Sequence, residues 1–322
     1  MYSYYITKNG KIEREGNTLY FYGEGIRQHL PAMNISSIII SAKVSVSSWA
    51  IDYLSKLGIV THFISEEGVY LSSLIPYSRN QTGQTVVAQT ISYIENGKRL
   101  AIAREMVMGI KQNILRNLRY YARKITVDKE IEKIENYQVS GNTVSSLMGI
   151  EGNIWSEYYS TFPKIYRGLD GFKRAFRPPP DPINSMISYG NSLLYSTALT
   201  SIITSGLNPS ISYLHEPSDR AFSLALDIAD VFKPVIVEQV IARIVNNNMA
   251  KDTYFAYRDN GCYLNEYGRK LLLSEYRNKL ESTLKTRSGR YLSYESIILE
   301  ECYKLLKGIK GEAKYESYKA VD

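Results

Sequence analysis

Residues 68–84, GVYLSSLIPYSRNQTGQ, mark the place where the pattern of the sequence changes. The first half is a β-branched and aromatic segment that is typical of a strand. The second half, PYSRNQTGQ at 76–84, contains the turn-forming residues Pro, Ser, Asn and Gly, and it predicts a linker. Strand-like segments precede the linker, and helical periodicity follows it. We therefore predict an α+β protein with a small N-terminal β-strand domain at 1–75 and a larger, all-α C-terminal domain at 85–322.

Short strands are expected before the linker, because segments rich in β-branched and aromatic residues alternate there with Gly, Asn and Ser. One helix fits among them at 45–58, with Ser47 or Ser48 as its N-cap and Gly58 at its end. These features predict a small β-rich domain. Its expected strands are TLYFYG at 18–23, SSIIISAKV at 36–44, VTHFIS at 60–65 and GVYLSSLI at 68–75.

Helical periodicity dominates the chain after the linker. Apolar residues recur every three or four positions from Ile102 to Leu118, which predicts one long helix over about 97–125. Three consecutive prolines at 178–180 exclude a helix there. The polar segment after Gly308 predicts a frayed tail. The remaining helices are predicted at about 84–95, 128–136, 140–163, 184–205, 218–248, 266–284 and 290–307.

Positive charge is locally concentrated. The chain has 322 residues and a formal net charge of +7; residues 98–124 contain eight basic residues and one acid, and residues 266–290 contain seven basic residues and three acids. Such clusters bind polyanions, and a solvated basic helix face is the alternative interpretation. The 28 tyrosines suit stacking on nucleic-acid bases, with compositional bias as the alternative.

Three features bear on cellular location. No stretch approaches the ~18 uncharged apolar residues that a membrane span requires. The N-terminal segment MYSYYITKNGK has too short an apolar part for a signal peptide. The two cysteines, Cys262 and Cys302, lack metal-type spacing, and so few thiols indicate a reducing compartment. We expect a cytoplasmic protein that does not enter the membrane.

A histidine and several acids accompany one apolar helix. His215 lies just before the helix predicted at 218–248, most of which is apolar and is expected to be buried. On a helical wheel, one band of this helix is polar. The band either faces water or holds a ligand. Its members are Arg220, Ser223, Asp227, Asp230, Pro234 and Glu238.

A further acid lies on an aromatic helix face. Glu151 shares one helical stripe with Trp155, Tyr158 and Phe162, and an unpaired carboxylate is costly to bury there. Glu151 together with His215 and the two aspartates suggests a divalent-metal site. Because the set is mainly oxygen with one imidazole, it favours Mg²⁺ or Mn²⁺ over structural zinc.

Three motifs resemble one known family. GIEG at 149–152, RPPPDPIN at 177–184 and GLNPSISYLHEPSDRAFSLALDIADVFKP at 206–234 are similar, in order and spacing, to motifs of the CRISPR-associated integrase family, the universal Cas subunit of spacer acquisition. The first 75 residues also resemble that family's N-terminal β domain. The resemblance implies a metal-dependent DNA endonuclease and integrase that joins 3′-hydroxyl ends of DNA fragments to repeat DNA by transesterification.

The resemblance also implies roles for individual residues. Glu151, His215 and Asp230 match the family's catalytic metal ligands, for Mg²⁺ or Mn²⁺. Many members carry Glu-Glu where this chain has Asp230-Val231. The residues expected near the site are Asp227, Lys233, Asn184, Ser188 and Tyr189. The residues expected to bind DNA are Arg116, Arg119, Arg123, Arg174, Arg177 and Lys233.

Partners follow from the same resemblance. They are double-stranded DNA with 3′ ends, CRISPR repeat DNA, a second copy of the chain and a small second Cas protein. Dimer contacts are expected partly in the N-terminal β domain, and Ile38–Ile40 fit either such a contact or ordinary core. Two alternative functions stay open: a structure-selective, metal-dependent DNA nuclease without integrase activity, and a non-catalytic nucleic-acid-binding scaffold.

Overall fold

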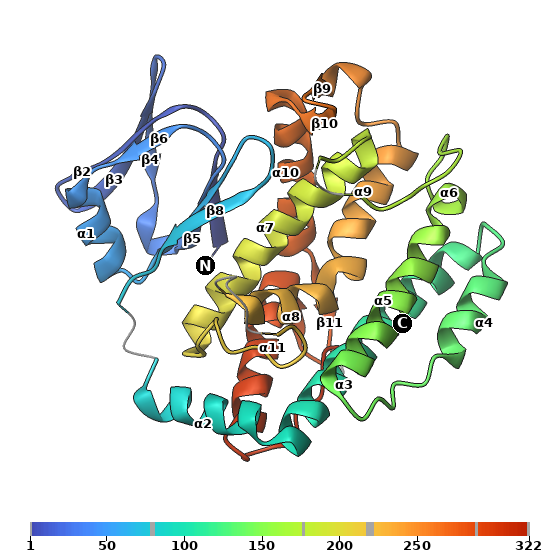
Figure 1. The fold of residues 1–322 in the computed structure, drawn as a ribbon. Coiled ribbons are helices and arrows are strands. Elements are labelled where there is room, and N and C mark those ends of the chain that lie inside the picture. Colours follow the sequence, from blue (N-terminus) through green and yellow to red (C-terminus); the bar gives the residue numbers. More distant parts are fainter. Residues whose placement is uncertain (1, 78–80, 176–177, 217–221, 287–288, 321–322) are drawn as a thin grey trace.

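The structure, a computed structural model, describes residues 2–77, 81–175, 178–216, 222–286 and 289–320. An N-terminal β region and a larger, mostly helical region lie side by side, as Figure 1 shows. The change from strands to helices falls at the predicted linker: the last strand of the β region ends at Leu74, and the next helix begins at Gly83.

The N-terminal region contains β1 (Tyr2–Ile6), β2 (Gly10–Glu15), β3 (Thr18–Gly23), β4 (Ile26–Leu30), β5 (Ile35–Ile40), β6 (Val44–Val46), β7 (Val60–Ile64) and β8 (Tyr70–Leu74). They form two four-stranded sheets, of order β1-β5-β7-β8 and β4-β3-β2-β6. Strand β5 pairs in parallel with β1 and β7, so it is internal to its sheet. Internal parallel strands are apolar on both faces, and Ile38–Ile40 are indeed buried. Their interpretation as core is confirmed.

The predicted helix of this region is also present, as α1 (Ser48–Lys56). Ser47 is its N-cap, because the Ser47 side chain accepts a hydrogen bond from the Ala50 amide at 3.2 Å. Gly58 follows the helix with a positive φ of 71°, which glycine adopts without strain. Strands β1, β2 and β4 were not predicted, and β6 was not predicted as a separate strand. The sequences of β2 and β4, GKIERE and IRQHL, lack a strand pattern because they carry charged and polar residues on the solvent-facing side.

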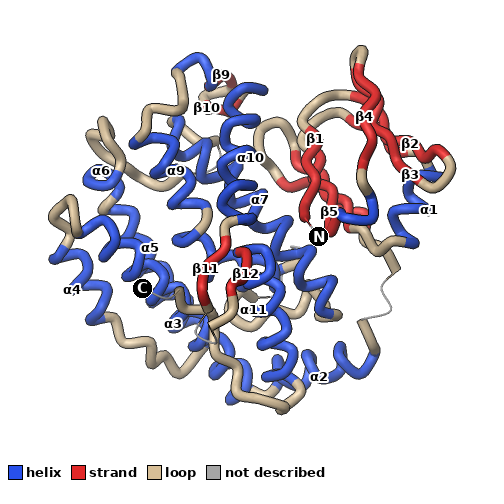
Figure 2. Tube along the Cα trace, turned by 180° about the vertical axis from the view of Figure 1, so that it is seen from behind, coloured by secondary structure: helices blue, strands red, loops and turns tan. Residues whose placement is uncertain are grey.

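The rest of the chain is mostly helical. Its helices are α2 (Gly83–Ile94), α3 (Asn96–Ala122), α4 (Asp128–Asn136), α5 (Val144–Ser160), α6 (Phe162–Ile165), α7 (Pro182–Ser205), α8 (Ser223–Phe232), α9 (Val237–Asn246), α10 (Glu266–Glu281) and α11 (Tyr294–Ile309). Two hairpins, β9 (Phe255–Arg258) with β10 (Gly261–Leu264) and β11 (Thr283–Lys285) with β12 (Tyr291–Ser293), show that this region is not all-α. Figure 2 shows the β11–β12 hairpin between α10 and α11. No helix in the described ranges is both long and apolar enough to cross a membrane.

The single helix predicted at 218–248 is two helices. Residues 217–221 lie outside the described part. Helix α8 ends at Phe232, a 3₁₀ turn spans Lys233–Val235, and α9 follows. Pro234 explains the break, because proline has no amide hydrogen and its ring clashes with the preceding helical turn. The break separates Glu238 from the aspartates of α8.

Helix α7 connects the two regions. The Nε2 atom of the buried His62 on β7 lies 2.8 Å from the Thr200 Oγ1 atom of α7. Nearer the start of α7, the Tyr189 hydroxyl donates a hydrogen bond to Ser41 Oγ at 2.7 Å. The apolar core is continuous across this contact, because buried residues of β5 and β7 join the core of the helices. The division of the chain into domains at 76–84 stays a prediction.

The prediction of a frayed tail is wrong for residues 312–320. These residues fold back onto α3 and α11, and they bury Tyr315 and Ser317. The contacts involve residues far away in the sequence, so the polar composition of the segment did not reveal them. Both cysteines, Cys262 and Cys302, are buried free thiols.

Candidate functional site

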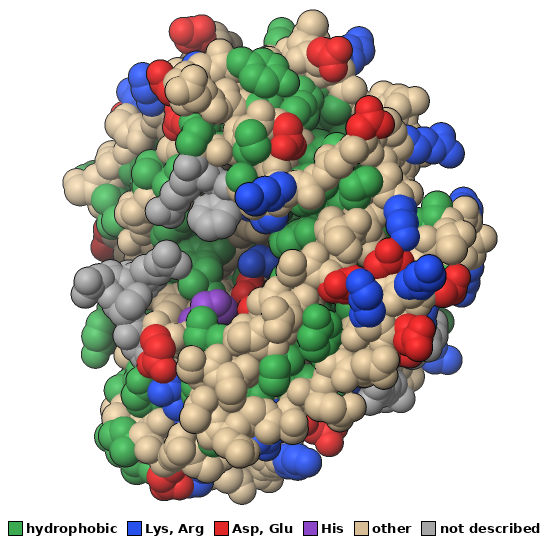
Figure 3. All heavy atoms as spheres, turned by 45° about the vertical axis from the view of Figure 1, so that its right-hand side comes forward, with side chains coloured by type: hydrophobic (Ala, Val, Ile, Leu, Met, Phe, Trp, Pro, Cys, Tyr) green, Lys and Arg blue, Asp and Glu red, His purple; other side chains and the backbone are tan. Residues whose placement is uncertain are grey.

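The candidate residues are brought together by α5, by the loop before α8 and by α8 itself. Helix α3 packs against both α5 and α8 and so fixes their relative position. Glu151 comes from α5, His215 from the loop, and Asp227 and Asp230 from α8. Figure 3 shows a hollow on this side of the molecule, with histidine and acidic side chains inside it and Lys or Arg side chains beside it.

Asp227 organises the loop. Its carboxylate is 0% exposed. The Oδ2 atom accepts hydrogen bonds from the amides of Tyr213 at 2.7 Å and Leu214 at 3.1 Å, and Oδ1 accepts one from the His215 amide at 2.9 Å. A buried carboxylate with three backbone donors is well satisfied. Asp227 is therefore a positioning residue for the segment that carries the histidine.

The same carboxylate orients the ring of His215. The Nδ1 atom of His215 lies 2.8 Å from Asp227 Oδ1, so Nδ1 carries a proton. The other ring nitrogen, Nε2, lies 3.7 Å from Asp230 Oδ2. Burial by itself lowers the pKa of His215, but the hydrogen bond to Asp227 and the charges of Asp230 and Glu151 raise this pKa to about 9. Nε2 is thus the nitrogen that faces the other candidate residues.

Asp230 is buried and contacts a cation. Its carboxylate is 4% exposed and forms an ion pair with the ammonium of Lys233, one helical turn further on. The same ammonium lies 5.7 Å from the centre of the Trp155 ring. A buried carboxylate is costly unless it is paired or hydrogen-bonded. In the described structure, Lys233 and His215 are its partners.

Glu151 lies close enough to these groups to interact with their charges. Burial is the main factor that raises its pKa to about 7, and the negative charge of Asp230 adds to it, whereas Lys233 and His215 oppose the increase. A Cβ atom added at Gly149 or at Gly152 would meet no other part of the described structure within 4 Å. No other described residue therefore covers the surface of α5 at these two glycines.

The residue types fit a divalent cation, although their arrangement is not yet a metal site. Among the described residues, no three His, Cys, Asp or Glu side chains converge closely enough to hold a metal ion. Two carboxylates and one imidazole nitrogen are nevertheless ligands that Mg²⁺ and Mn²⁺ accept. The mutual repulsion of Glu151 and Asp230 would be relieved by a cation.

The residues of the predicted polar motif lie in two different surroundings. Asn184 Oδ1 accepts a hydrogen bond from Arg174 Nη1 at 2.9 Å, and Ser188 Oγ accepts one from Arg174 Nη2 at 3.1 Å. These three residues form one hydrogen-bonded group. Tyr189 is not part of it, because its hydroxyl points to Ser41 of the β region. Arg177 lies outside the described residues.

The polar band of the predicted helix does not face water. Asp227, Asp230 and Glu238 are all buried, so that interpretation is wrong for its acidic members. Glu238 accepts a hydrogen bond from the Tyr166 hydroxyl at 3.2 Å. Burial raises the pKa of Glu238 to about 7, and the positive charge of Arg174 opposes this increase. Glu238 therefore belongs to the interior on the Arg174 side.

Sequence analysis missed the residue that holds the histidine loop from outside. Arg99 on α3 donates from Nε to the Tyr213 carbonyl at 3.1 Å and from Nη2 to Glu216 Oε1 at 2.8 Å. Its guanidinium also lies 4.2 Å from the centre of the Tyr93 ring. The sequence placed Arg99 in a basic segment expected to attract polyanions. No local signal distinguishes it from the other arginines there.

The arginines of the first basic segment have different surroundings. Arg119 and Arg123 are exposed, and Arg119 forms an ion pair with Glu135 at 2.6 Å. Arg116 is half-buried and lies near Lys279 of the second basic segment. Burial is the larger cause, and Arg116 the smaller one, of the lowering of the Lys279 pKa to about 8. The two basic segments thus meet at Arg116.

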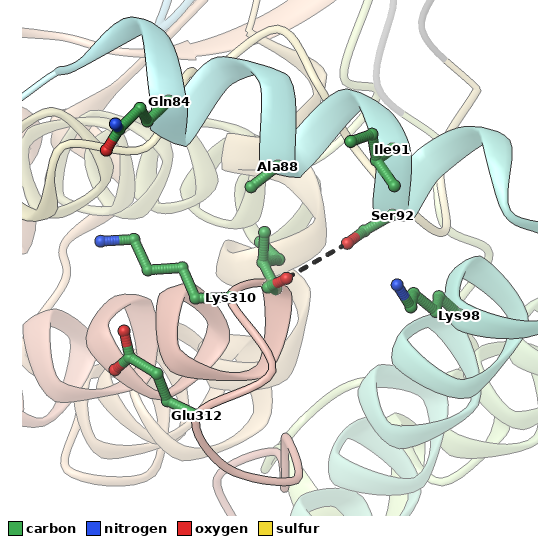
Figure 4. Close-up of a pocket in the computed structure, with 8 residues that line it drawn as sticks. Gln84, Ala88, Ile91, Ser92, Lys98, Lys310 and Glu312 are labelled. Atoms are coloured by element: carbon green, nitrogen blue, oxygen red, sulfur yellow. Dashed lines mark hydrogen bonds between the residues drawn. The ribbon is translucent and has the colours of Figure 1, made fainter.

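Two cavities are lined by other residues. One, of about 500 Å³, lies between α2 and the end of α11, where Ser92 donates to the Ile309 carbonyl at 3.5 Å (Figure 4). The other, of about 910 Å³, lies between the β region, α7 and the start of α11. None of the candidate residues lines either cavity, so cavity size does not identify this site.

Several proteins of known structure have this fold. A CAS1 protein from Thermotoga maritima has a TM-score of 0.86 and 33% identity, covering 99% of both chains. A casposase bound to integration product has a TM-score of 0.85 and 21% identity, covering 100% of this chain and 96% of that one. A Cas1 chain from a Cas6-RT-Cas1–Cas2 complex has a TM-score of 0.85 and 18% identity, covering 100% of this chain and 36% of that one. At such low identity, the last two show the fold alone.

Sequence comparison identifies the family. The family described as CRISPR associated protein Cas1 matches residues 4–278. A relative named CRISPR-associated endonuclease Cas1 3, from Thermodesulfovibrio yellowstonii, is 39% identical over 323 aligned positions, which cover 99% of each chain. Another, CRISPR-associated endonuclease Cas1 from Clostridium perfringens, is 38% identical and covers 98% of each chain. The chain belongs to the Cas1 family of CRISPR-associated endonucleases.

Proposed function

We propose that this Cas1 protein joins the 3′-hydroxyl ends of short DNA fragments to CRISPR repeat DNA by transesterification. The observation that carries the proposal is the proximity of Glu151, His215 and Asp230, which come from two helices and a loop and whose charges interact. The motifs that resemble the integrase family contain these same residues. The casposase with this fold is bound to an integration product, which agrees with the proposal.

Glu151, His215 and Asp230 are proposed to hold Mg²⁺ or Mn²⁺. A bound divalent cation would supply Lewis-acid stabilisation of charge on the phosphate oxygens. His215 suits this role because Asp227 holds its Nδ1 proton and leaves Nε2 for a ligand. The ion pair between Asp230 and Lys233 supports the proposal, because a positive charge already lies beside this carboxylate.

The proposed reaction exchanges one phosphodiester for another. The oxygen of the fragment's 3′-hydroxyl attacks a phosphorus atom of the repeat, a new P–O bond forms, and the bond to the original 3′ oxygen breaks. The attacking hydroxyl loses a proton and the leaving oxygen gains one, so no ATP is consumed. His215 serves either as a ligand through Nε2 or as a carrier of these protons. Lys233 offers its positive charge to a phosphate beside Asp230.

The DNA backbone is proposed to lie along basic surface near this site, with Lys233 in contact with Asp230 and Arg174 as a further basic residue. Arg119 and Arg123 add exposed positive charge on α3. Replacing both with serine is expected to lower affinity for duplex DNA and to reduce the slope of log K against log salt by about 2, because two phosphate contacts are lost. Fluorescence anisotropy across a salt series measures this slope. An unchanged slope would place the DNA elsewhere.

The proposed partners are a second copy of the chain and a small second Cas protein. Strand β5 does not supply the dimer contact, because it is internal to its sheet. The edge strand β8 is a better candidate: Leu71 is 62% exposed, and Leu74, Val69 and Ile75 beside it are also exposed. An exposed apolar edge strand is a typical pairing surface. The related Cas1 chain solved with Cas2 supports the second partner.

A joining assay tests the function. Labelled DNA fragments are incubated with supercoiled plasmid that carries a CRISPR repeat, with and without the second Cas protein, in Mg²⁺ or Mn²⁺. We expect joined product at the repeat ends, and none from fragments with 3′-dideoxy ends, which lack the attacking hydroxyl. Cutting without joining would support the nuclease alternative. DNA binding with neither reaction would support the scaffold alternative.

A further inference from the structure

We propose that residues 312–320, here called the tail, are a strap that positions the C-terminal end of α8, with Tyr318 and Asn113 as its positioning residues. This inference deepens the proposed function and rests on it, because the last turn of α8 carries Asp230 and is followed by Lys233. The tail is firmly anchored, it contacts α8 directly, and the end of α8 needs external partners.

The tail is anchored on α11 by a buried acid. Glu301 is 0% exposed, and its Oε1 atom accepts hydrogen bonds from the Tyr315 hydroxyl at 2.7 Å and from the Tyr318 amide at 3.0 Å. Lys304 forms an ion pair with the same carboxylate and donates to the Glu316 carbonyl at 2.8 Å. Buried charge-assisted hydrogen bonds of this kind are strong. The tail is therefore a fixed part of the fold.

Two glycines make room for the tail. A Cβ atom at Gly109 on α3 would lie 2.3 Å from Ser317 Oγ, and one at Gly308 on α11 would lie 2.7 Å from the Cβ atom of Tyr315. Both positions are inside helices, where glycine is less favourable than alanine by about 1 kcal/mol. The close approach of the tail explains why glycine occurs at both.

The tail contacts the last turn of α8 directly and is also joined to it through Asn113 of α3. The Tyr318 ring stacks on Phe232, with centroids 5.0 Å apart and an interplanar angle of 16°. Asn113 of α3 donates from Nδ2 to the Val231 carbonyl at 2.8 Å and to the Tyr318 carbonyl at 3.2 Å. Its Oδ1 atom accepts from the Ala320 amide at 2.8 Å. One buried amide side chain thus joins α8 to the tail.

The end of α8 depends on such outside contacts. The last carbonyls of a helix lack regular intrahelical donors, and Pro234 adds no amide hydrogen in the following turn. Val231 and Phe232, which Asn113 and Tyr318 hold, lie between Asp230 and Lys233 in the chain. The tail and α3 therefore set the direction in which this last turn presents Asp230 to His215 and Glu151.

Substitution of Tyr318 tests the strap. The Tyr318 hydroxyl has no hydrogen-bond partner among the described residues, so Tyr318→Phe removes nothing but that hydroxyl and keeps the stack. We expect Tyr318→Ala to lower kcat for DNA cleavage and for joining by about 10- to 100-fold, because small misplacements of reacting groups have effects of this size. KM for DNA should stay within about twofold, because the exposed basic surface is unchanged. Tyr318→Phe should restore wild-type values.

Amide hydrogen exchange supplies a readout that does not require activity. Exchange in peptides covering 224–236 should accelerate in Tyr318→Ala and not in Tyr318→Phe, relative to peptides from the β region. Lys319→Ala is a matched control in the tail: it removes a 3.4 Å ion pair with Glu105 on α3, and Lys319 has no hydrogen bond or ion pair with α8 among the described residues, so kcat and exchange should not change. If Tyr318→Ala does not fold, Tyr318→Leu replaces it, with the same expectations.

The outcomes separate this inference from the proposed function. Cleavage without joining by the wild-type protein would overturn the proposed function, and the strap would then be judged on the kcat for cleavage. If the wild type shows neither reaction, amide hydrogen exchange tests the inference. Unchanged protection of α8 in Tyr318→Ala would then refute the positioning role of the tail. A wild-type kcat in Tyr318→Ala, or equal losses in Tyr318→Ala and Lys319→Ala, also overturns it.

Discussion

Replacing Glu151 with glutamine is expected to lower DNA joining and DNA cleavage by about 10³-fold, while affinity for DNA stays within about twofold. The amide cannot supply the negative charge that holds a divalent cation, but it preserves the volume and shape of the side chain. Gel-based joining and cleavage assays, with anisotropy for DNA binding, measure both parts of the expectation.

The same substitution should not destabilise the protein. The pKa of Glu151 is raised to about 7, above its ordinary value of 4.5, by burial and by the charge of Asp230. Ionisation of this group therefore costs folding free energy as pH rises from 4.5 through 7. Glutamine avoids that cost, so the Tm of Glu151→Gln at about pH 8 should equal or exceed that of the wild type.

Glu157→Gln is the matched control on the same helix, because Glu157 forms a 3.0 Å ion pair with Lys133 and has no part in the candidate site. Its joining rate should remain that of the wild type. Joining by Glu151→Gln at the wild-type rate in Mn²⁺ would remove Glu151 from the catalytic set. A large fall in Tm together with lost activity would instead assign it a structural role.

Replacing Asp227 with alanine is expected to lower the free energy of unfolding by about 3–5 kcal/mol and to abolish joining. The change leaves the buried amides of Tyr213, Leu214 and His215 without their acceptor, and each buried unsatisfied group costs about 1–3 kcal/mol. It also releases the ring of His215. Urea denaturation followed by circular dichroism measures the stability.

Asp230→Asn is the comparison that separates the two acids of α8. Asp230 pairs with side chains, and Lys233, which is 19% exposed, is able to turn toward water when that pair is broken. We expect Asp230→Asn to lose joining by about 10³-fold and to lose less stability than Asp227→Ala, because it leaves no buried backbone amide without an acceptor. Equal destabilisation by Asp227→Ala and Asp230→Asn would refute the division of roles proposed for them.

Local patterns were sufficient for four of the strands and for the order of most helices. Strand-forming segments, the turn residues at 76–84 and the long apolar stripe from Ile102 to Leu118 depend on neighbours in the chain, and the structure has these elements close to the predicted bounds. Element ends that depend on one residue were also predictable where that residue was recognised, as with Ser47 and Gly58. Pro234 likewise marks the end of a helix, and the prediction of one helix across this proline was wrong.

The identity of the candidate residues also came from the sequence, through motifs that resemble one family. Their roles did not. Asp227 and Asp230 lie one turn apart on a helix that is buried almost all round. The periodicity of the sequence therefore does not show what either side chain faces. Only the folded loop shows that Asp227 binds backbone amides, whereas Asp230 contacts His215 and Lys233.

The sequence by itself determined the two-part architecture, the positions of most helices and the set of acids and histidine that the fold brings together. The tertiary structure alone decided that Tyr189 faces the β region, that Arg99 holds the histidine loop and that the polar tail packs against α8. The reason is physical: these contacts join residues that lie 86 to 148 positions apart in the chain. Hydrogen bonds and packing between such residues depend on how helices pack together, which no local periodicity records.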